Sequence, residues 1–191
     1  DFKFISRIIA LIKKFLNTLS GELYYLDFET FRLAVPMLDG TKPYQQIPFQ
    51  WSLHVGDKHF EFLYHSKGDP RLEFLQSLKE VLGSDGSIIT YNQSFEIRML
   101  REMALAYPSF HDWVESVVVR VVDLIVPFRQ FAYYNPLQKG SCSLKKVLPA
   151  IVGKDYSGLE IADGDTASIS YLQGGNRDDL LKYSKMNTEA M

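Results

Sequence analysis

The sequence is almost without cysteine, because Cys142 is the only one among 191 residues. A single cysteine cannot form an internal disulfide, which is typical of proteins from a reducing compartment, so we expect a cytoplasmic location. Net charge is also scarce, at −2 near neutral pH. No overall field would draw such a chain to nucleic acid or to anionic lipid, so any polyanion site must be local.

Long uninterrupted apolar runs are missing as well. The most apolar candidate, residues 2–19, is broken by the basic side chains Lys3, Arg7, Lys13 and Lys14. It therefore lacks the roughly 18 apolar residues in a row that a membrane span needs. Its apolar residues recur at helical spacing, which predicts an amphipathic helix. That helix could lie on a membrane surface, but packing on this or a neighbouring domain is the better hypothesis.

The sequence has enough apolar residues for a hydrophobic core, with 46% hydrophobic and 14% aromatic residues. One domain with an appendage is expected at this length. We predict that residues 1–20 form an N-terminal helix linking to an upstream region, because the sequence starts at Asp1 without an initiator methionine. Residues 21–191 are predicted to form the domain itself, and additional N-terminal domains of a longer protein are expected partners.

Alternating apolar residues and turn signals predict an antiparallel start followed by strand-helix units. The first three strands are predicted at residues 23–30, 47–55 and 59–65, with a helix at 70–82. Later strands are predicted at 87–92 and 116–123, with a helix at 95–107 between them. The β-branched density of SVVVRVVD favours a strand for the last of these. The order predicts a mixed α/β sheet with helices on both faces.

Acidic side chains gather where these predicted strands end. Asp27 and Glu29 are two residues apart, so on a strand they share a face. Glu96 follows the strand at 87–92, and Asp123 ends the last strand. Functional side chains collect at strand ends in such sheets. A carboxylate cluster with few basic neighbours suits Mg²⁺ or Mn²⁺, hard ions that prefer oxygen ligands.

The closely spaced pair Asp27 and Glu29 has two interpretations. Two anions this close raise each other's pKa unless a cation or a proton lies between them, which suggests a metal. Alternatively, one of them points to solvent and the pair merely ends a strand. Other catalytic signatures are missing from the sequence, including a glycine-flanked serine elbow and a phosphate-binding glycine loop.

These motifs carry a resemblance to a known family. LDFETF at residues 26–31, YNQSFE at 91–96, VDL at 122–124 and a final helix stand in an order that resembles the DEDD superfamily of 3′-to-5′ exonucleases. Together with PYQQIPFQWSLH at 43–54 and GSCSLKKVLP at 140–149, they look like a bacterial domain family of unknown function within it. The resemblance covers residues 22–191 and implies a ribonuclease-H-like fold.

The resemblance also implies roles for individual residues. Asp27 and Glu29 match the first exonuclease motif, and Glu96 matches the second, whose acid is usually aspartate. Tyr183 and Asn187 match the motif Y-x-x-x-D. The implied metal ligands are Asp27, Glu29, Glu96 and Asn187, which would hold two Mg²⁺ or Mn²⁺ ions. Tyr183 would help to position a water that attacks a phosphodiester of DNA or RNA at a single-stranded 3′ end.

Further residues near these motifs are expected to support the site. Asp123 is expected to orient the ligands rather than bind metal. The expected substrate-binding residues are Thr30, Phe31, Gln46 and Asn92. Aromatic and amide groups after the first motif can stack bases or bond the strand. The alternative for the aromatic ones, which include Tyr44, Phe49 and Trp51, is core packing. Basic side chains such as Lys145 can contact phosphates, although charged side chains usually face water.

Asn187 stands where the family has a metal-binding aspartate. An amide offers a carbonyl oxygen to a hard cation but no negative charge, so affinity for at least one ion should fall. Three interpretations stay open: an inactivated variant, a natural member with low activity, and a catalytically silent module that binds nucleic acid or protein on the same fold.

Overall fold

A five-stranded mixed sheet forms the centre of the computed structural model, which describes residues 2–191, with side chains from residue 8 onward. Its strands are β1 (Leu23–Phe31), β2 (Ile47–Val55), β3 (Lys58–Leu63), β4 (Ser87–Thr90) and β5 (Val121–Asp123), in the spatial order β3-β2-β1-β4-β5. The first three pair antiparallel, whereas β4 is parallel to β1 and β5 is parallel to β4. The predicted ribonuclease-H-like α/β sheet is confirmed.

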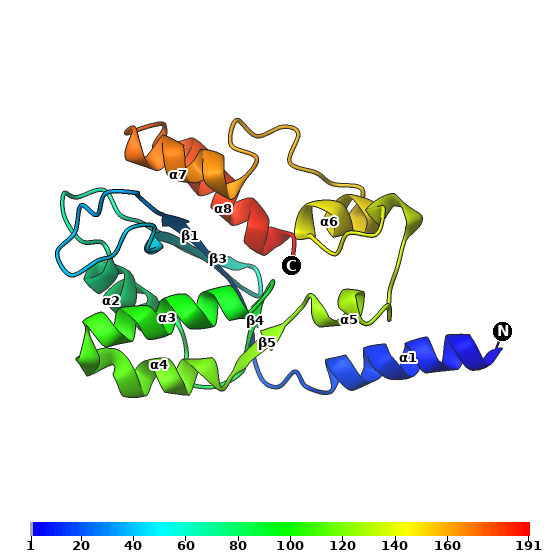
Figure 1. The fold of residues 1–191 in the computed structure, drawn as a ribbon. Coiled ribbons are helices and arrows are strands. Elements are labelled where there is room, and N and C mark those ends of the chain that lie inside the picture. The colour runs from blue at the N-terminus through cyan, green and yellow to red at the C-terminus, as the bar shows by residue number, and fades with distance from the viewer. Residues whose placement is uncertain (1) are drawn as a thin grey trace.

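Helices cover both faces of this sheet (Figure 1). On one side lie α2 (Arg71–Val81), α3 (Ser94–Ala106) and α4 (His111–Val118), and on the other lie α7 (Gly164–Leu172) and α8 (Arg177–Glu189). Alternation along β1 turns Leu26 and Phe28 toward the first group, where they join the larger apolar core. The intervening Asp27 and Glu29 therefore face α8.

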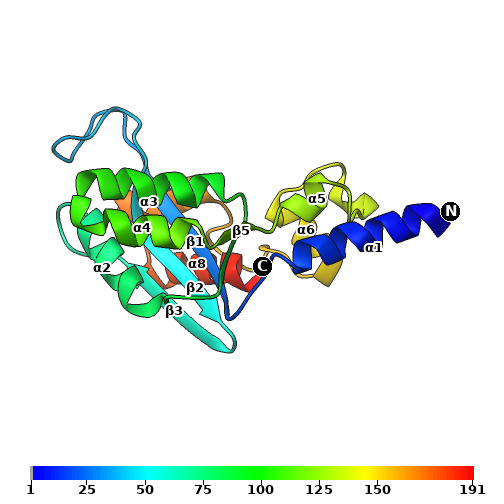
Figure 2. The ribbon, with the colours of Figure 1, turned by 90° about the horizontal axis from the view of Figure 1, so that it is seen from below.

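The remaining helices lie beyond the β5 edge of the sheet, as Figure 2 shows from below. They are α1 (Phe2–Leu16), α5 (Val126–Arg129) and α6 (Leu144–Val152), with short 3₁₀ turns at Pro108–Phe110 and Pro136–Gln138. The predicted N-terminal helix is present and packs beside α5. Among residues 2–191, no helix combines the length and the apolar character needed to cross a bilayer.

The prediction of one strand over residues 116–123 is wrong. Residues 116–118 complete α4, and only Val121–Asp123 form β5. Val114 and Val117 are buried against the larger core at a spacing of three, so their helical face outweighs the preference of β-branched residues for strands. The sheet edge is correspondingly short.

Candidate functional site

Asp27 and Glu29 lie inside β1, on the face of the sheet that α8 covers. They stand opposite Ser52 and Gln50 of β2, and the register shifts directly after Glu29. Glu29 is buried, with 7% of its surface exposed, and Asp27 is partly buried. Both side chains point into the molecule, so the interpretation that one of them faces open solvent does not hold.

Asn187 joins these two acids from the last turns of α8. Its Nδ2 donates hydrogen bonds to Asp27 Oδ2 at 3.0 Å and to Glu29 Oε1 at 3.2 Å. The nitrogen end of the amide faces the carboxylates because only that end can donate. A neutral amide thus bridges two acids, at the place where a cation would neutralise them.

Glu96 approaches from the first turn of α3. It is 3% exposed, and among the described residues its Oε2 has no hydrogen-bond partner. Burial raises its pKa well above the ordinary value, and the negative charges of Asp27, Asp123 and Glu29 add to the rise. Native proteins pair almost all buried polar atoms, so an acid with an unused oxygen needs an explanation.

The two β1 acids are perturbed in the same direction. Burial raises the pKa of Asp27 to about 7, although the hydrogen bond from Asn187 opposes the rise. Burial and then the charge of Asp27 raise the pKa of Glu29 well above its ordinary value, and the Lys145 ammonium opposes this rise. Without a bound cation, the site therefore favours the protonated forms of these acids. Such perturbed acids cluster at functional sites.

Two tyrosines and a lysine close the site from the other side. Tyr183 lies one helical turn before Asn187 on α8, and its ring centroid is 6.2 Å from that of Tyr156. Lys145 Nζ lies 5.8 Å from each of these rings. Burial and the carboxylate charges raise the pKa of both phenols, so both hydroxyls stay protonated at neutral pH. No sequence motif marks Tyr156, which lies in the connection between α6 and α7.

Asp123 and Asn92 stabilise a turn beside Glu96 and do not contact the acid pair Asp27 and Glu29 through hydrogen bonds. Asp123 Oδ1 accepts the backbone N–H groups of Asn92 at 2.8 Å and of Ile125 at 3.1 Å. Asn92 has a φ of +78°, in the left-handed region that asparagine tolerates better than most residues. Its Oδ1 accepts a hydrogen bond of 3.3 Å from Arg129. This turn sets where α3 starts and hence where Glu96 points.

The expected substrate-binding residues fall into two groups. Thr30 Oγ1 accepts a hydrogen bond of 3.3 Å from Gln46 Nε2, and both line a cleft of about 390 Å³ together with Glu29 and Phe95. Phe31 instead packs in the core, 8% exposed, with its ring 5.7 Å from that of Tyr171. Because α7 covers Phe31, its ring is not available to a substrate, contrary to the prediction. Phe49 and Trp51 are also buried.

The donor set suits a hard cation in its chemistry. Asp27, Glu29 and Glu96 offer oxygens only, and Glu96 Oε2 is unused. Within the described part of the chain, however, no three His, Cys, Asp or Glu side chains are arranged to hold one ion together. Asn187 would also have to turn its carbonyl oxygen toward a cation. The described residues therefore offer the ligand type that a hard cation prefers, but Asp27, Glu29 and Glu96 are not arranged as the ligands of one ion.

Sequence comparisons match the chain to one family model and to proteins of three bacteria. The family described as Domain of unknown function (DUF2779) matches residues 24–143. The "Uncharacterized protein MG366 homolog" of Mycoplasma pneumoniae and "Uncharacterized protein MG366" of Mycoplasma genitalium are each 29% identical over 83% of this chain. "Uncharacterized protein UU173" of Ureaplasma parvum is 29% identical over 72% of it. The chain spans only 28%, 28% and 22% of the lengths of these relatives.

Two solved structures share the fold. The family B DNA polymerase of the archaeon Pyrobaculum calidifontis superposes with a TM-score of 0.61 at 16% identity, over 88% of this chain and 23% of the polymerase. The Nibbler EXO domain of Aedes aegypti superposes with a TM-score of 0.52 at 14% identity, over 95% of this chain and 78% of that domain. At such low identity, the likeness establishes an exonuclease-like fold and nothing finer.

Proposed function

The chain belongs to the family Domain of unknown function (DUF2779), and from that premise we propose that it is a metal-dependent 3′-to-5′ exonuclease domain of the DEDD type, hydrolysing phosphodiesters of DNA or RNA. One observation carries the proposal. The partly buried Asp27 and the buried Glu29 and Glu96 all have raised pKa values, and Glu96 Oε2 has no hydrogen-bond partner among the described residues. A divalent cation would satisfy this arrangement.

Each residue has a role in the proposed reaction. Asp27, Glu29 and Glu96 would hold two Mg²⁺ or Mn²⁺ ions, with Asn187 as a neutral fourth ligand. Bound ions of this kind supply a more acidic water and stabilise the charge on the leaving oxygen. The protonated Tyr183 hydroxyl would orient the attacking water by a hydrogen bond. Thr30 and Gln46, which line the adjoining cleft, would bind the last nucleotide.

Asn187 sets the expected level of activity. A metal at Asp27 and Glu29 must displace the two hydrogen bonds that the amide donates to them. The amide then offers one uncharged oxygen, so we expect weak metal binding and slow hydrolysis. An aspartate at position 187 would donate no hydrogen bonds that a metal must displace, and it would offer the metal a charged oxygen.

Degradation of 5′-labelled single-stranded DNA and RNA in Mn²⁺ tests this function. The expected order of rates is Asn187→Asp above wild type, and wild type above Asp27→Ala, which should be inactive. Lys58→Ala, a charge change on the far strand β3, is the matched control and should behave as wild type. If folded Asn187→Asp, saturated with Mn²⁺, cleaves neither substrate, the nuclease proposal fails.

A second candidate function is a catalytically silent module that binds nucleic acid. The Asn187 amide favours it, because the amide already bridges Asp27 and Glu29 without a metal. Such a module would bind single strands equally well in EDTA and in Mn²⁺. The exonuclease should instead bind more tightly in the presence of a metal that does not support cleavage, such as Ca²⁺.

The context of this chain in a longer protein and in the cell is also part of the proposal. Because the chain covers 28% of the length of its Mycoplasma relatives, we propose that it works beside further domains of a longer chain. We propose the reducing cytoplasm as its compartment, and the free thiol of Cys142 supports this. Expression of the full-length gene product, followed by cell fractionation, tests both points.

A further inference from the structure

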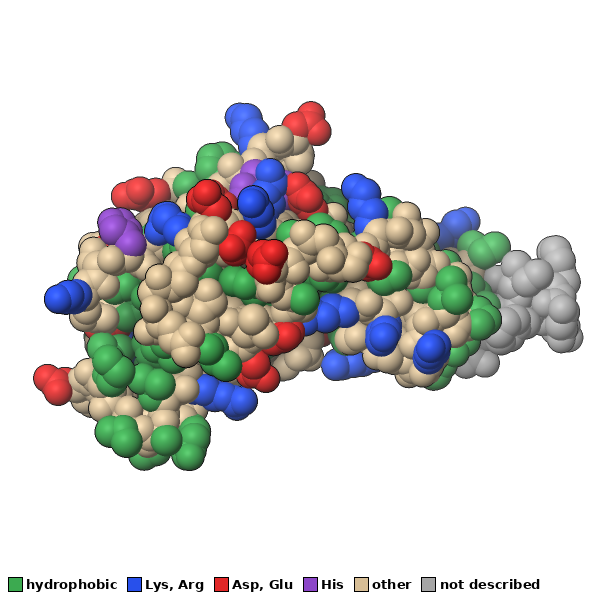
Figure 3. Space-filling model, turned by 90° about the horizontal axis from the view of Figure 1, so that it is seen from above, with side chains coloured by type: hydrophobic (Ala, Val, Ile, Leu, Met, Phe, Trp, Pro, Cys, Tyr) green, Lys and Arg blue, Asp and Glu red, His purple; other side chains and the backbone are tan. Residues whose placement is uncertain are grey.

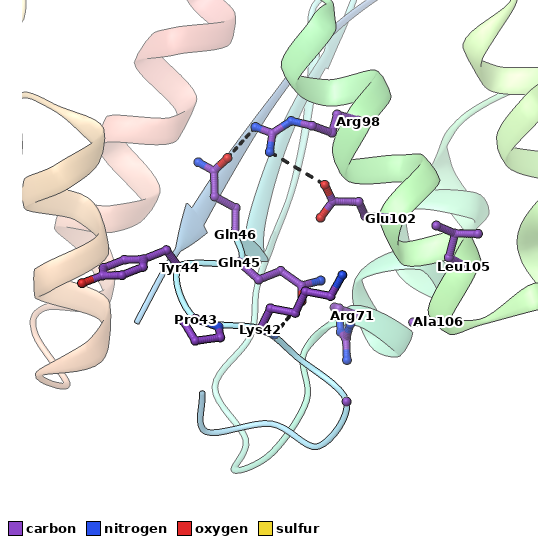
Figure 4. A pocket seen from close by; sticks show the side chains of 11 residues that line it. Lys42, Pro43, Tyr44, Gln45, Gln46, Arg71, Arg98, Glu102, Leu105 and Ala106 are labelled. Atoms are coloured by element: carbon purple, nitrogen blue, oxygen red, sulfur yellow. Dashed lines mark hydrogen bonds and ion pairs between the residues drawn. The ribbon is translucent and has the colours of Figure 1, made fainter. Parts of the chain in front are cut away.

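A second and larger cleft lies between the β1–β2 loop and α3 (Figure 4). Its volume is about 580 Å³. The loop contributes Lys42, Gln45 and Gln46, and α3 contributes Arg98 and Glu102. Figure 4 shows the Arg98 guanidinium reaching from the helix toward Gln46, and the Lys42 and Gln45 side chains reaching from the loop toward the helix. We call this cleft the basic groove.

The basic groove is lined by three cationic side chains, Lys42, Arg71 and Arg98, and by one acidic side chain, Glu102. Lys42 is exposed and has no ion pair within the described residues. Arg98 is half exposed and meets Glu102 only at 3.8 Å, too far for a hydrogen bond. Arg71, at the floor, is neutralised by Asp69 at 2.6 Å. On the face over α7 and α8, by contrast, acidic and basic side chains are interspersed (Figure 3).

The basic groove is continuous with the acidic site through one residue. Gln46 lines both the basic groove and the smaller cleft that contains Glu29. Its amide donates from Nε2 to Thr30 and accepts at Oε1 from Arg98. A chain-like ligand could therefore pass from the acids, past Gln46, to Arg98 and Lys42.

The loop that carries Lys42 is held in a defined conformation. Gln45 Oε1 accepts the backbone N–H of Lys42 at 3.0 Å, and the Tyr44 N–H donates to Leu33 O at 2.7 Å. Tyr44 has a φ of +59°, and its ring points away from Lys42 and Arg98 in Figure 4. Tyr44 lines the groove, but its ring lies apart from the cations and amides of Lys42, Arg98 and Gln46. A preformed cationic site loses little entropy on binding.

We propose that the basic groove binds the sugar–phosphate backbone of a single-stranded polynucleotide, on the side of the strand that leads away from Asp27 and Glu29. This proposal deepens the proposed function and rests on it for the position of the 3′ end. Arg98 offers a planar fork that matches a phosphate, and Lys42 offers a point charge. Gln45 and Gln46 can donate to phosphate and sugar oxygens. Such contacts position a strand without reading its bases.

Binding of a short 5′-fluorescein oligothymidylate, followed by fluorescence anisotropy in EDTA, tests the groove without any cleavage. Lys42→Gln and Arg98→Gln should each weaken binding by about tenfold, the scale of one lost hydrogen bond to a charged group. Each should also lower the slope of log affinity against log salt by about 0.7, the value for one phosphate contact to a single strand.

Arg101→Gln is the matched control. Arg101 lies on the same helix and loses the same charge, but it pairs with Glu115 at 2.8 Å, outside the groove. It should bind the strand as wild type does, and circular dichroism should show all three variants folded. Oligouridylate should give the same pattern, because no base is read.

The outcomes separate this proposal from the nuclease proposal. If folded Lys42→Gln and Arg98→Gln bind as tightly as Arg101→Gln, the groove proposal is overturned, whatever the nuclease assay shows. If they bind weakly but no variant cleaves in Mn²⁺, the groove is supported and the nuclease proposal fails. If thymidine monophosphate displaces the strand as well as unlabelled oligothymidylate does, the groove is a mononucleotide site and the proposal is overturned.

Discussion

Asp123 and Glu96 are neighbouring buried acids at one end of the sheet, with 7% and 3% of their surfaces exposed, but their surroundings differ. Asp123 Oδ1 accepts two backbone N–H groups, those of Asn92 and Ile125. Glu96 Oε2 accepts none from the described residues. Hydrogen bonds to a buried carboxylate offset the free energy lost on its desolvation. A buried carboxylate with an unpaired oxygen lacks this compensation and destabilises the fold. The difference separates an acid that holds a turn from an acid available to a ligand.

Asp27 and Glu29 resemble Glu96, because their carboxylates also have few hydrogen-bond partners. Each receives one hydrogen bond from the neutral Asn187 amide, and neither has a salt bridge among the described residues. Lys145 lowers the pKa of Glu29 without pairing directly with it. At these three acids, stability and ligand binding are therefore expected to oppose each other.

Removing Asp123 should have the largest effect on stability. Asp123→Ala leaves one buried and one partly buried backbone N–H donor without an acceptor. A lost acceptor costs about 1–3 kcal/mol per buried donor, so we expect a loss of about 3 kcal/mol in the free energy of unfolding. Asp123→Asn keeps Oδ1 as an acceptor and should lose less than half of that. Urea unfolding measures both. Equal losses for the two variants would mean that the charge, not the acceptor, holds the turn.

The pH dependence of stability in EDTA should reveal Asp27. Its pKa of about 7 in the folded state exceeds its ordinary value of 3.8, so the folded state holds this proton more tightly. The stabilisation is complete below the ordinary value and is lost as the pH rises toward 7. We expect a decline of about 2 kcal/mol relative to Asp27→Asn, because each pKa unit is worth about 1.4 kcal/mol and Asp27 is partly exposed. If the free energies of unfolding of wild type and Asp27→Asn change with pH in parallel, the raised pKa of Asp27 is contradicted.

Glu96→Gln should change stability in the direction opposite to Asp123→Ala. The substitution removes a charge that burial and three acidic neighbours disfavour. In EDTA at pH 8, we expect the free energy of unfolding to rise by about 1 kcal/mol. Urea unfolding beside the Asp123 variants gives the comparison in one experiment. A loss as large as that of Asp123→Ala would show that Glu96 also holds the fold.

The smallest effect is expected at Tyr156. Its hydroxyl is buried without a hydrogen-bond partner among the described residues, so Tyr156→Phe removes no bond. Thermal unfolding should change by less than the equivalent of about 0.5 kcal/mol. Tyr183→Phe, on the ring beside it, is the matched variant and should slow any Mn²⁺-dependent cleavage. A clear loss of stability in Tyr156→Phe would reveal a partner for its hydroxyl.

Local patterns predicted most of the sheet, because strands with one buried face alternate and their turns carry glycine and asparagine. The spacing of Asp27 and Glu29 was enough to place them on one face. The β-branching of residues 116–118 predicts a strand, but Val114 and Val117, three residues apart, bury a helical face in the larger core. Local preference gave way there to packing in that core.

The rest of the site depends on contacts between distant segments. Phe31 does lie on the same face as Glu29, but α7 covers it, and nothing within β1 signals that cover. Tyr156 lies close enough to Asp27 and Glu29 to feel their charges, although it belongs to the connection between α6 and α7, far from them in the sequence. The bridging of Asp27 and Glu29 by Asn187 spans about 160 residues, and only resemblance to a family suggested that α8 would close the site.

Calorimetric titration of Mn²⁺ into the chain at pH 8 determines whether Asp27, Glu29 and Glu96 bind a cation. We expect saturable binding by wild type, tighter binding by Asn187→Asp and loss of binding in Asp27→Asn, with the affinity of Asp123→Asn unchanged. Identical isotherms for wild type and folded Asp27→Asn would contradict this expectation.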